Sequence, residues 1–528
     1  MTAAAGDIDL NDVIPALRRA GSNHIEFYDA SGLARKTMAQ VDADVRAAES
    51  VLRGLGLSAR GRIGILGWTS YQWVVIDLAC LAGGFVTVPL DPEVSWPRDR
   101  IARDFALDIV LTNHSDFVDA GGCFVSFDRI FDKDAACASS DPAHWEQHEP
   151  FTVIFTSGTT GEPKIIEVKK ECFDDQFSNA LPMFDITRQD KILVFLPMHI
   201  YLERCYVYLA ILREFNVVVA PTRFVLKALK AAEFTFAVGI PQFFSSLQDL
   251  FLLQIRSHRS TRLRCRTRLL LFRLNLGFSL RRPFAPFQRL LGGRARFFLT
   301  GSAPCPLPTL RFYQAMGIPI YEGYGMSEIA GMIALNYPGN TKLGTVGRVF
   351  PHKEVKLDSS GQILVRSAKC AINSYWRAPD EINAATFGPD GWVATGDVGQ
   401  FDSDGYLTIK GRVKDVVVLS NGRKVQPAPI EAEINCVPFV DYSVVVGDDR
   451  PYLVALVSVK APNLDTTELD ACFRRLNQSR PEADQVRKYH VLTERFTAEN
   501  GLLTHALKLN RQQVKQRYAA VIDNLYAP

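Results

Sequence analysis

FTVIFTSGTTGEPKIIEV, residues 151–168, is the stretch from which the fold can be worked out. Residues 151–155 are β-branched or aromatic and have the composition of a buried strand. In the polar loop that follows, glycines let backbone N–H groups approach anionic oxygens, while hydroxyls and one cation supply further donors. The GxxxxGK[ST] pattern is not met, because the letters EPKI follow the last glycine. We therefore predict a polyphosphate site of another type, formed by Thr156, Ser157, Gly158, Thr159, Thr160, Gly161 and Lys164.

Strands and helices alternate on both sides of this stretch. Such alternation predicts an α/β fold with mostly parallel sheets covered by helices on both faces. After Leu335 short apolar runs are separated by turn pairs such as Ser360-Gly361, which predicts antiparallel hairpins in a small β-rich subdomain. The expected strands are 62–66, 86–90, 108–111, 192–196, 217–220, 236–240, 294–300 and 318–321, and the expected helices are 70–82, 202–212 and one from 225.

A chain of 528 residues is longer than one hydrophobic core usually supports, so at least two domains are expected. We place the boundary where the hairpin region ends. The prediction is an N-terminal domain of residues 1–411, a hinge at 412–415 and a small mobile α+β domain at 416–528.

The composition, 47% hydrophobic and 22% charged, is typical of a soluble globular protein. Ten cysteines are scattered without a CxxC pair, so zinc sites and disulfide frameworks are not expected and a reducing, cytoplasmic compartment is the simplest interpretation. The first residues do not combine a basic start with an apolar core, and no apolar run is long enough to span a membrane.

Two more loops are expected at strand ends. Gly301, Ser302 and Ala303 follow the run RARFFLT, and the sequence EGYGMSE at 322–328 follows the strand at 318–321. Because open α/β sheets bind ligands at the carboxyl ends of strands, we expect these loops and the phosphate loop to meet at one crevice. Tyr324 would pack on an adenine ring, and Glu328 offers an oxygen ligand for Mg²⁺.

At these residues the chain resembles the adenylate-forming superfamily, which includes acyl-CoA synthetases, luciferases and peptide-synthetase adenylation domains. The phosphate loop matches the family's TSGTTGxPK, although Ile165 stands where a glycine is usual, and YEGYGMSE matches YGxTE with Ser327 for Thr. The resemblance implies ATP and Mg²⁺ as ligands, with Asp397 of the TGD sequence on the ribose hydroxyls and Arg412 assisting. It also implies nucleotide contacts from Gly301, Ser302, Ala303, Glu322, Gly323, Tyr324, Gly325 and Ser327, and magnesium contacts from Thr156 and Glu328, both counted as catalytic.

The C-terminal part resembles the mobile domain of the same family. Lys414 lies two residues after the arginine and would be the hinge, while Gly422 would give a thiol acceptor its path. LTHALKLNR at 503–511 is similar to the LTxTLKxxR sequence of the long-chain acyl-CoA synthetase branch. The resemblance makes Lys508 the catalytic cation that neutralises charge between the substrate carboxylate and the α-phosphate.

The acid-binding pocket is less defined by the sequence. LPMHIYLER at 196–204 resembles the LPLxHxxER of long-chain enzymes and implies that His199 lines the pocket, although a hydrogen-bonded structural histidine fits the pattern as well. Gly301, Gly325 and Met326 would complete the pocket.

The segment 256–296 is rich in arginine. From Leu250 to Tyr321 there are thirteen arginines and no Asp or Glu. Because leucines and phenylalanines are interleaved, the segment could lie on anionic lipid as a peripheral membrane contact. We favour the simpler interpretation of a solvated helical excursion, and nucleic acid is not expected because no binding motif accompanies the charge.

Together these features predict ATP-dependent activation of a carboxylic acid to acyl-AMP, followed by transfer to coenzyme A. An adenylate-forming amide synthetase, or a carrier-protein acyl ligase, would share the first step and differ in the acceptor. A membrane-associated nucleotide-binding protein without turnover is the alternative of another class. The identity of the acid and the oligomeric state do not follow from the sequence.

Overall fold

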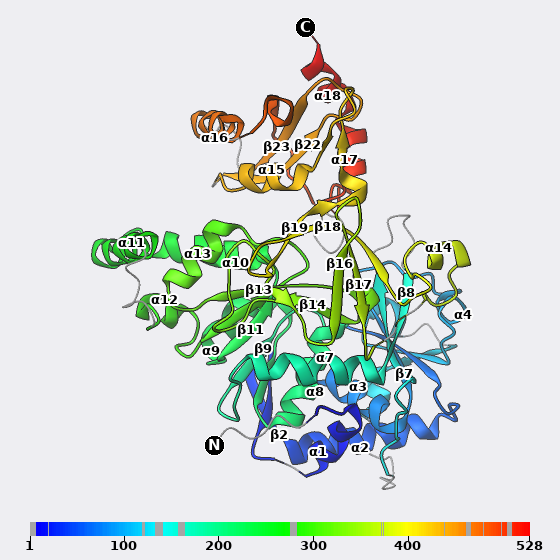
Figure 1. Ribbon diagram of the computed structural model, residues 1–528. Helices are drawn as coiled ribbons and strands as arrows, with labels where there is room; N and C mark the ends of the chain where they lie inside the picture. The colour runs from blue at the N-terminus through cyan, green and yellow to red at the C-terminus, as the bar shows by residue number, and fades with distance from the viewer. Residues whose placement is uncertain are drawn as a thin grey trace.

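The computed structural model describes residues 7–527, apart from 20, 119–121, 132–140, 157–163, 275–281, 371, 373, 438, 461–465, 479, 498 and 504–508. Three β-sheets and their helices form a large body, and a smaller unit that includes the C-terminus is joined to it by a narrow connection (Figure 1).

A six-stranded sheet carries the phosphate-loop stretch. Its inner strands are parallel, as the sequence predicts, and β3 (Arg62–Leu66) lies between β4 (Val86–Leu90) and β5 (Ile109–Thr112). The stretch itself forms an antiparallel hairpin of β7 (Pro150–Thr156) and β8 (Lys164–Lys169), of which β7 is joined to β4 in parallel. The strand order is β6 (Phe124–Ser126), β5, β3, β4, β7 and β8.

A nine-stranded sheet stands beside the first. Its central strands are parallel, whereas β2, β14 and β15 are antiparallel to their neighbours. The strand order is β15 (Arg348–Val349), β14 (Gly331–Leu335), β13 (Ile320–Met326), β12 (Phe297–Thr300), β11 (Phe236–Gly239), β9 (Lys191–Val194), β10 (Asn216–Val219), β1 (His24–Asp29) and β2 (Gly32–Thr37).

Two buried helices, α3 (Tyr71–Gly83) and α8 (Tyr201–Arg213), pack within the large body (Figure 1). Arg204 of α8 is buried, and its guanidinium donates to Asp77 of α3 with Nε to Oδ2 at 3.1 Å. The same guanidinium donates to the hydroxyls of Thr87 in β4 and Thr152 in β7, both at 2.6 Å. A buried charge of this kind persists only when it is paired and fully hydrogen-bonded, so Arg204 fixes both helices to the strands below the phosphate loop.

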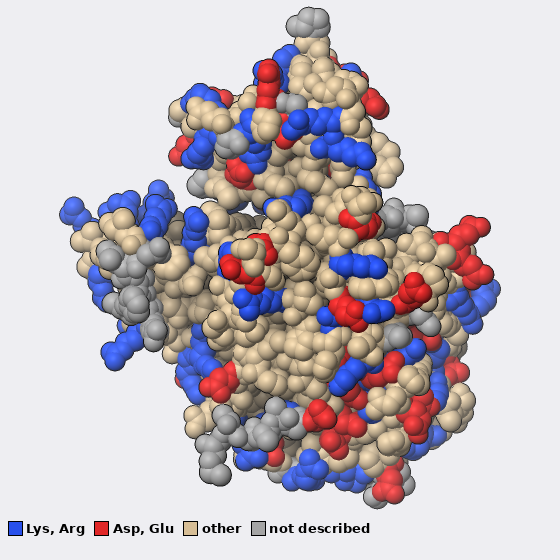
Figure 2. All heavy atoms as spheres, in the orientation of Figure 1, with Lys and Arg blue, Asp and Glu red and all other residues tan. Residues whose placement is uncertain are grey.

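The remaining helices of the large body cover the outer faces and edges of the sheets. They are α1 (Val13–Arg18), α2 (Met38–Gly54), α4 (Ile101–Asp104), α5 (Ser115–Val118), α6 (Phe127–Ile130), α7 (Lys170–Ala180), α9 (Val225–Ala231), α10 (Pro241–Gln254), α11 (Arg259–Arg273), α12 (Ala285–Leu290), α13 (Leu307–Ala315) and α14 (Asp380–Ala384). Lys and Arg side chains gather over α11, which projects from the body at its left edge (Figure 2).

The hairpins predicted after Leu335 form a four-stranded antiparallel sheet of β16 (Lys353–Leu357), β17 (Gln362–Ser367), β18 (Val393–Phe401) and β19 (Leu407–Arg412). A 3-10 turn at Val413–Asp415 leads from β19 into the C-terminal unit. That unit contains the hairpin β20 (Val417–Val418) and β21 (Lys424–Val425), the sheet β22 (Val440–Val446), β23 (Leu453–Val459) and β24 (Val486–Leu492), and the helices α15 (Pro427–Ile434), α16 (Thr467–Gln478), α17 (Arg511–Arg517) and α18 (Ala519–Tyr526).

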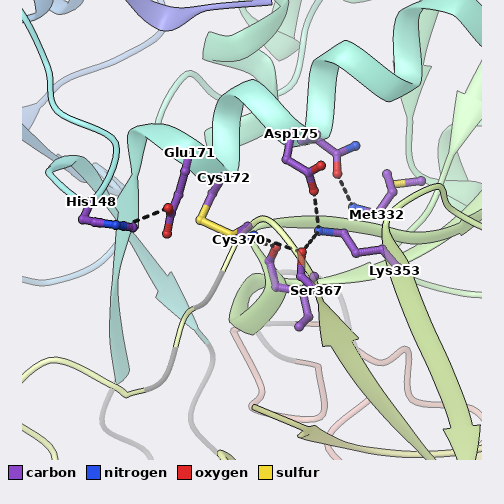
Figure 3. The surroundings of a disulfide bond; sticks show 10 residues. His148, Glu171, Cys172, Asp175, Met332, Lys353, Ser367 and Cys370 are labelled. Carbon is purple, nitrogen blue, oxygen red and sulfur yellow. Dashed lines mark hydrogen bonds and ion pairs between the residues drawn. A yellow bond between two sulfur atoms is a disulfide. The ribbon is translucent and has the colours of Figure 1, made fainter. Parts of the chain in front are cut away.

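The expectation of a disulfide-free chain is wrong. Cys172 of α7 and Cys370, which follows β17, form a disulfide with a sequence separation of 198 residues (Figure 3). Spacing could not reveal this pair, because the two segments meet only when the four-stranded sheet packs against α7. Beside the disulfide, Lys353 of β16 donates to Asp175 of α7 at 3.0 Å and to Ser367 at 2.9 Å. The disulfide and this buried ion pair hold the β16–β19 sheet to α7, the helix that directly follows β8 of the six-stranded sheet.

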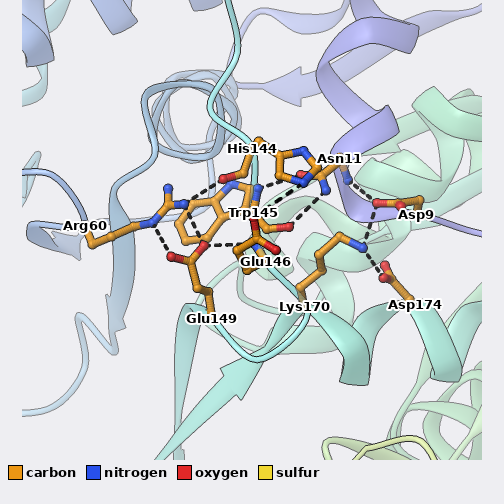
Figure 4. A network of polar contacts seen from close by, with 9 residues as sticks. All are labelled: Asp9, Asn11, Arg60, His144, Trp145, Glu146, Glu149, Lys170 and Asp174. Atoms are coloured by element: carbon orange, nitrogen blue, oxygen red, sulfur yellow. Dashed lines mark hydrogen bonds and ion pairs between the residues drawn. The ribbon is translucent and has the colours of Figure 1, made fainter.

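The N-terminal segment is held to the start of α7 by polar contacts (Figure 4). Lys170 is paired with Asp9 at 2.9 Å and with Asp174. Asn11 exchanges two hydrogen bonds with the Trp145 backbone, at 2.8 and 3.0 Å. Burial raises the pKa of Asp174 to about 6. Residues near the chain start thus support the helix that follows the phosphate-loop hairpin.

Within the described part of the chain, no helix is long and apolar enough to cross a membrane.

Candidate functional site

The described ends of the phosphate-loop stretch are the last residue of β7 and the first residue of β8. Thr156, the last residue of β7, pairs with Lys164, the first residue of β8, so residues 157–163 connect directly opposed positions. Ser157, Gly158, Thr159, Thr160 and Gly161 lie outside the described residues. Ile165, which replaces the family's usual glycine, belongs to β8 and is buried. The loop exit is therefore extended strand.

The sequence 322–326 is a strand and not the loop that we expected. β13 continues to Met326 because β14 pairs with it in the antiparallel direction, with an irregularity between Tyr324 and Gly325. A Cβ atom on Gly325 would lie 2.3 Å from the Gly331 carbonyl oxygen, so only glycine fits this close approach of two backbones. Ser327 then begins a short 3-10 turn, Ser327–Ile329.

Tyr324, Asp397 and Arg412 form one polar cluster. The Tyr324 hydroxyl donates to Asp397 Oδ2 at 2.6 Å, and Arg412 Nε lies 2.9 Å from Asp397 Oδ1. Asp397 and Arg412 face each other in the β18–β19 hairpin, while Tyr324 comes from the nine-stranded sheet. Burial, and next the Asp397 charge, raise the pKa of Tyr324, so its hydroxyl stays a donor. Each carboxylate oxygen keeps a second lone-pair direction for another donor.

Glu328 is held by a tyrosine that we did not expect at the site. The Tyr375 hydroxyl donates to Glu328 Oε1 at 2.7 Å, and the Lys164 ammonium lies 4.5 Å from the centre of the same ring. The phosphate hairpin and the end of β13 therefore meet through one side chain. The sequence gives no signal for Tyr375, because it lies in an irregular segment between β17 and α14 without a motif that we identified.

The loop after β12 is joined to β13 by a buried carboxyl group. The Cys305 backbone N–H donates to Glu322 Oε1 at 3.2 Å, and burial raises the pKa of Glu322 to about 7. Glu322 thus holds the loop that contains Gly301, Ser302 and Ala303. A Cβ atom on Gly301 would lie 3.2 Å from the Gly323 carbonyl oxygen, so loop and strand are in close contact.

His199 lies before α8 and faces the carboxyl end of β4. Its Nε2 is 3.7 Å from Asp91 Oδ2, and the His199 side chain is 21% exposed. Burial lowers the pKa of His199, although Asp91 and Glu93 oppose this effect. Glu203, in the first turn of α8, is buried, and burial raises its pKa to about 8. A neutral histidine and a neutral carboxyl group suit the wall of an apolar pocket. The same observations also agree with a structural histidine that is held beside Asp91.

Lys414 lies in the 3-10 turn that connects the two units. Burial and the neighbouring Arg412 lower the pKa of Lys414, and Asp415 is 3.5 Å from Arg511 of α17. Gly422 is exposed in the turn between β20 and β21, with φ at +79°. Lys508 lies outside the described residues. The hinge at Lys414, the acceptor path at Gly422 and the role of Lys508 stay predictions.

The donor set suits a magnesium ion that arrives with phosphate. Among the described residues, no cluster of three or more His, Cys, Asp or Glu side chains could hold a metal. Mg²⁺ is usually held by one or two carboxylates together with substrate phosphates and water. Glu328 as carboxylate and Thr156 as hydroxyl fit that requirement, whereas they would not suffice for a metal bound by protein groups alone.

The fold is shared with solved structures. A large body of two sheets, an appended four-stranded sheet and a separate C-terminal unit also occur in the following two proteins. An acyl-adenylate complex of the Bacillus subtilis o-succinylbenzoate CoA synthetase MenE matches with a TM-score of 0.76 at 21% identity, over 97% of this chain and 98% of that one. ATP-bound MatB from Rhodopseudomonas palustris matches with a TM-score of 0.76 at 21% identity, over 97% and 100% of the two chains.

Sequence comparison gives the family. Residues 16–376 match the model of the AMP-binding enzyme family, and residues 414–528 match the AMP-binding enzyme C-terminal domain. The chain belongs to the AMP-binding enzyme family. A long-chain-fatty-acid–CoA ligase of Mycobacterium bovis, FadD15, is 29% identical over 93% of this chain and 92% of its own length. The long-chain-fatty-acid–CoA ligase FadD13 of Mycobacterium tuberculosis is 26% identical over 85% and 88%.

Proposed function

We propose that this protein is an ATP-dependent, AMP-forming ligase that activates a carboxylic acid as acyl-AMP and transfers the acyl group to coenzyme A. The observation that carries the proposal is the cluster of Tyr324, Asp397 and Arg412, which combines an aromatic ring with a carboxylate that has free lone pairs. Membership of the AMP-binding family and relatives named as long-chain-fatty-acid–CoA ligases support it. A fatty acid is therefore the first substrate class to test.

In this proposal different residues bind the ribose, the base and the phosphates of ATP. Asp397 accepts hydrogen bonds from the vicinal ribose hydroxyls, and Tyr324 packs against the base. Lys164 and the phosphate loop bind the outer phosphates, which leave together as pyrophosphate. When bound, Mg²⁺ would neutralise phosphate charge at Glu328 and Thr156.

The acid carboxylate attacks the α-phosphorus, its new P–O bond forms as the bond to pyrophosphate breaks, and Lys508 stabilises the developing negative charge. In the second step the thiol sulfur of coenzyme A attacks the acyl carbon, the thiol proton is lost, and AMP leaves. We assign the exchange between the steps to rotation at Lys414, which would replace Lys508 by the surface near Gly422.

The test is pyrophosphate release measured across a panel of acids of different chain length, with ATP and magnesium. Product masses with coenzyme A, a panel of amines and a carrier protein supplied separately then identify the acceptor. A thioester of coenzyme A is the expected product, and an amide would favour the alternative acceptor class. Silence with every acid, combined with measurable ATP binding, would refute the enzyme proposal and favour a nucleotide-binding protein without turnover.

We further propose that the protein acts from the cytoplasm at an anionic membrane surface, through the outer face of α11. Leu263 and Leu270 of α11 are 67% and 56% exposed and lie seven residues apart on one side of the helix, and Leu274, which follows the last residue of α11, is 58% exposed. Arginines surround them and no acidic side chain occurs in α11 (Figure 2). Exposed leucines beside arginines suit a lipid surface better than solvent alone, and suit nucleic acid poorly, so this proposal replaces the solvated excursion that we favoured from the sequence.

Vesicle sedimentation tests the contact. The protein is expected to sediment with vesicles that contain anionic phospholipid and much less with zwitterionic vesicles. Added salt should reduce the fraction of protein bound. Replacing Leu263 and Leu270 with serine should weaken binding about tenfold while leaving every arginine in place. Leu33→Ser, at an exposed leucine of β2, is the control. Equal binding by the double variant, or binding of nucleic acid in preference to vesicles, would overturn the membrane proposal.

A further inference from the structure

Tyr375 lies between two charged residues of the site without belonging to either loop. Its hydroxyl donates to Glu328 Oε1 at 2.7 Å, and its ring face lies 4.5 Å from the Lys164 ammonium. The tyrosine therefore contacts the cation with its face and the carboxylate with its hydroxyl.

The backbone around Tyr375 is anchored at several points. The Trp376 N–H donates to the Ile165 carbonyl at 2.8 Å, next to Lys164 in β8. The Tyr375 N–H donates to Asn383 Oδ1 at 2.7 Å, and the ring packs edge-on against Phe387 with centroids 5.0 Å apart. Tyr375 itself is 4% exposed. Such packing leaves the ring little rotational freedom, so the positions of its two charged partners are defined before any ligand arrives.

The disulfide anchors the other end of the same segment (Figure 3). Cys370 is bonded to Cys172 in α7, and the Cys370 N–H donates to Ser367 Oγ at 3.1 Å. The Cys370 sulfur is also 3.9 Å from the carbonyl oxygen of Ile329, the residue after Glu328. Residues on both sides of Tyr375 are thus tied to the two loops that its side chain joins.

We propose that Tyr375 is a positioning residue that holds Lys164 and Glu328 apart, in the places where magnesium-bound phosphates meet them. The inference rests on the proposed function, because it assigns phosphate to Lys164 and magnesium to Glu328. A charge-assisted hydrogen bond fixes the carboxylate, and a cation over an aromatic face keeps the lysine near the loop. Burial, and next the Glu328 charge, raise the pKa of Tyr375, which keeps its hydroxyl a donor at neutral pH.

Two substitutions separate the two contacts. Tyr375→Phe removes only the hydroxyl, and Tyr375→Leu removes the aromatic face as well. Tyr313→Phe is the control. The buried Tyr313 hydroxyl donates to the Phe244 carbonyl at 3.1 Å, so this substitution also removes a hydroxyl contact, but one that involves neither Lys164 nor Glu328. The first readout is magnesium titration of the thermal stabilisation that ATP gives the protein. The second compares pyrophosphate release with thioester formation from supplied acyl-AMP, a step that involves neither pyrophosphate nor its magnesium.

The magnesium concentration at half-effect should rise about tenfold in Tyr375→Phe, since one hydrogen bond to a charged group is lost, and should not change in Tyr313→Phe. Tyr375→Leu should also weaken binding of ATP without magnesium. Thioester formation from acyl-AMP should stay within about twofold of wild type in Tyr375→Phe. An unchanged magnesium midpoint in Tyr375→Phe, or equal losses in both half-reactions, would overturn the inference. If wild-type protein binds ATP but releases no pyrophosphate, the proposed function fails while the magnesium titration still decides the role of Tyr375.

Discussion

Asp397→Asn tests the ribose contact most directly. One oxygen of Asp397 accepts a hydrogen bond from Tyr324 and the other forms an ion pair with Arg412, so both oxygens have a partner in the free protein. Asparagine keeps the shape but removes the charge and turns one acceptor into a donor. Each hydrogen bond from a ribose hydroxyl to the charged group contributes about 1.5–3 kcal/mol. Losing one bond and weakening the other should cost about 2–3 kcal/mol, which is about 30- to 150-fold in ATP affinity.

The assay is a comparison of two nucleotides in two proteins by equilibrium titration. Wild-type protein should bind 2′,3′-dideoxy-ATP more weakly than ATP, whereas Asp397→Asn should bind both with similar, low affinity. For each protein the ratio of the two dissociation constants, for ATP and for dideoxy-ATP, is calculated. Comparing these ratios isolates the contact between carboxylate and ribose, because effects of the substitution on the rest of the nucleotide are the same for both ligands. Asp402→Asn is a suitable control, since Asp402 pairs with Lys342 at 2.7 Å in the same hairpin. The ribose assignment is refuted if Asp397→Asn still separates the two nucleotides as strongly as wild type does.

Lys508→Ala should reduce acyl-AMP formation at least about a hundredfold and leave transfer from supplied acyl-AMP nearly unchanged, and equal loss in both steps would contradict its role. Glu203 has a folded pKa of about 8 against 4.5, so its stabilising effect is complete below pH 4.5 and is lost as the pH rises through 8. The free energy of unfolding of Glu203→Gln, measured in urea, should therefore increase relative to that of wild type by about 4–5 kcal/mol between pH 4.5 and pH 8. A difference between the two proteins that does not change with pH would contradict the raised pKa. Reduction of the Cys172–Cys370 disulfide should lower stability by about 2–4 kcal/mol in wild type and have no effect in Cys172→Ser. Intact-mass analysis with and without an alkylating reagent checks the bond itself, and alkylation of Cys370 without reductant would exclude it.

Much of the fold could be predicted, because hydrophobic patterns mark buried parallel strands well. The run 62–66 is β3 with unchanged bounds, and the hairpin region after Leu335 is antiparallel as expected. Membership of the family was predicted from ordered motifs, and the family match confirms it. The glycines at 323 and 325 favoured a loop, but pairing with β14 overrides the low strand propensity of glycine.

The parts that could not be predicted depend on contacts between distant segments. The disulfide joins α7 to the end of β17, and a cysteine's partner depends on the packing of whole elements. Tyr375 contacts Lys164 and Glu328 from an irregular segment, where no periodicity marks a functional side chain. In contrast, Asp397 and Arg412 lie in one hairpin, so their proximity follows from local pairing.

The bond between Cys172 and Cys370 closes a covalent ring that contains every strand from β9 to β17. A protease that cuts once inside this ring would leave both fragments joined, and they would separate on a denaturing gel only after reduction. If the molecule is stretched from its two ends, the disulfide transmits the force, so the residues inside the ring are not extended. Reducing the bond would release roughly 650–700 Å of additional contour length for its 198 residues of separation.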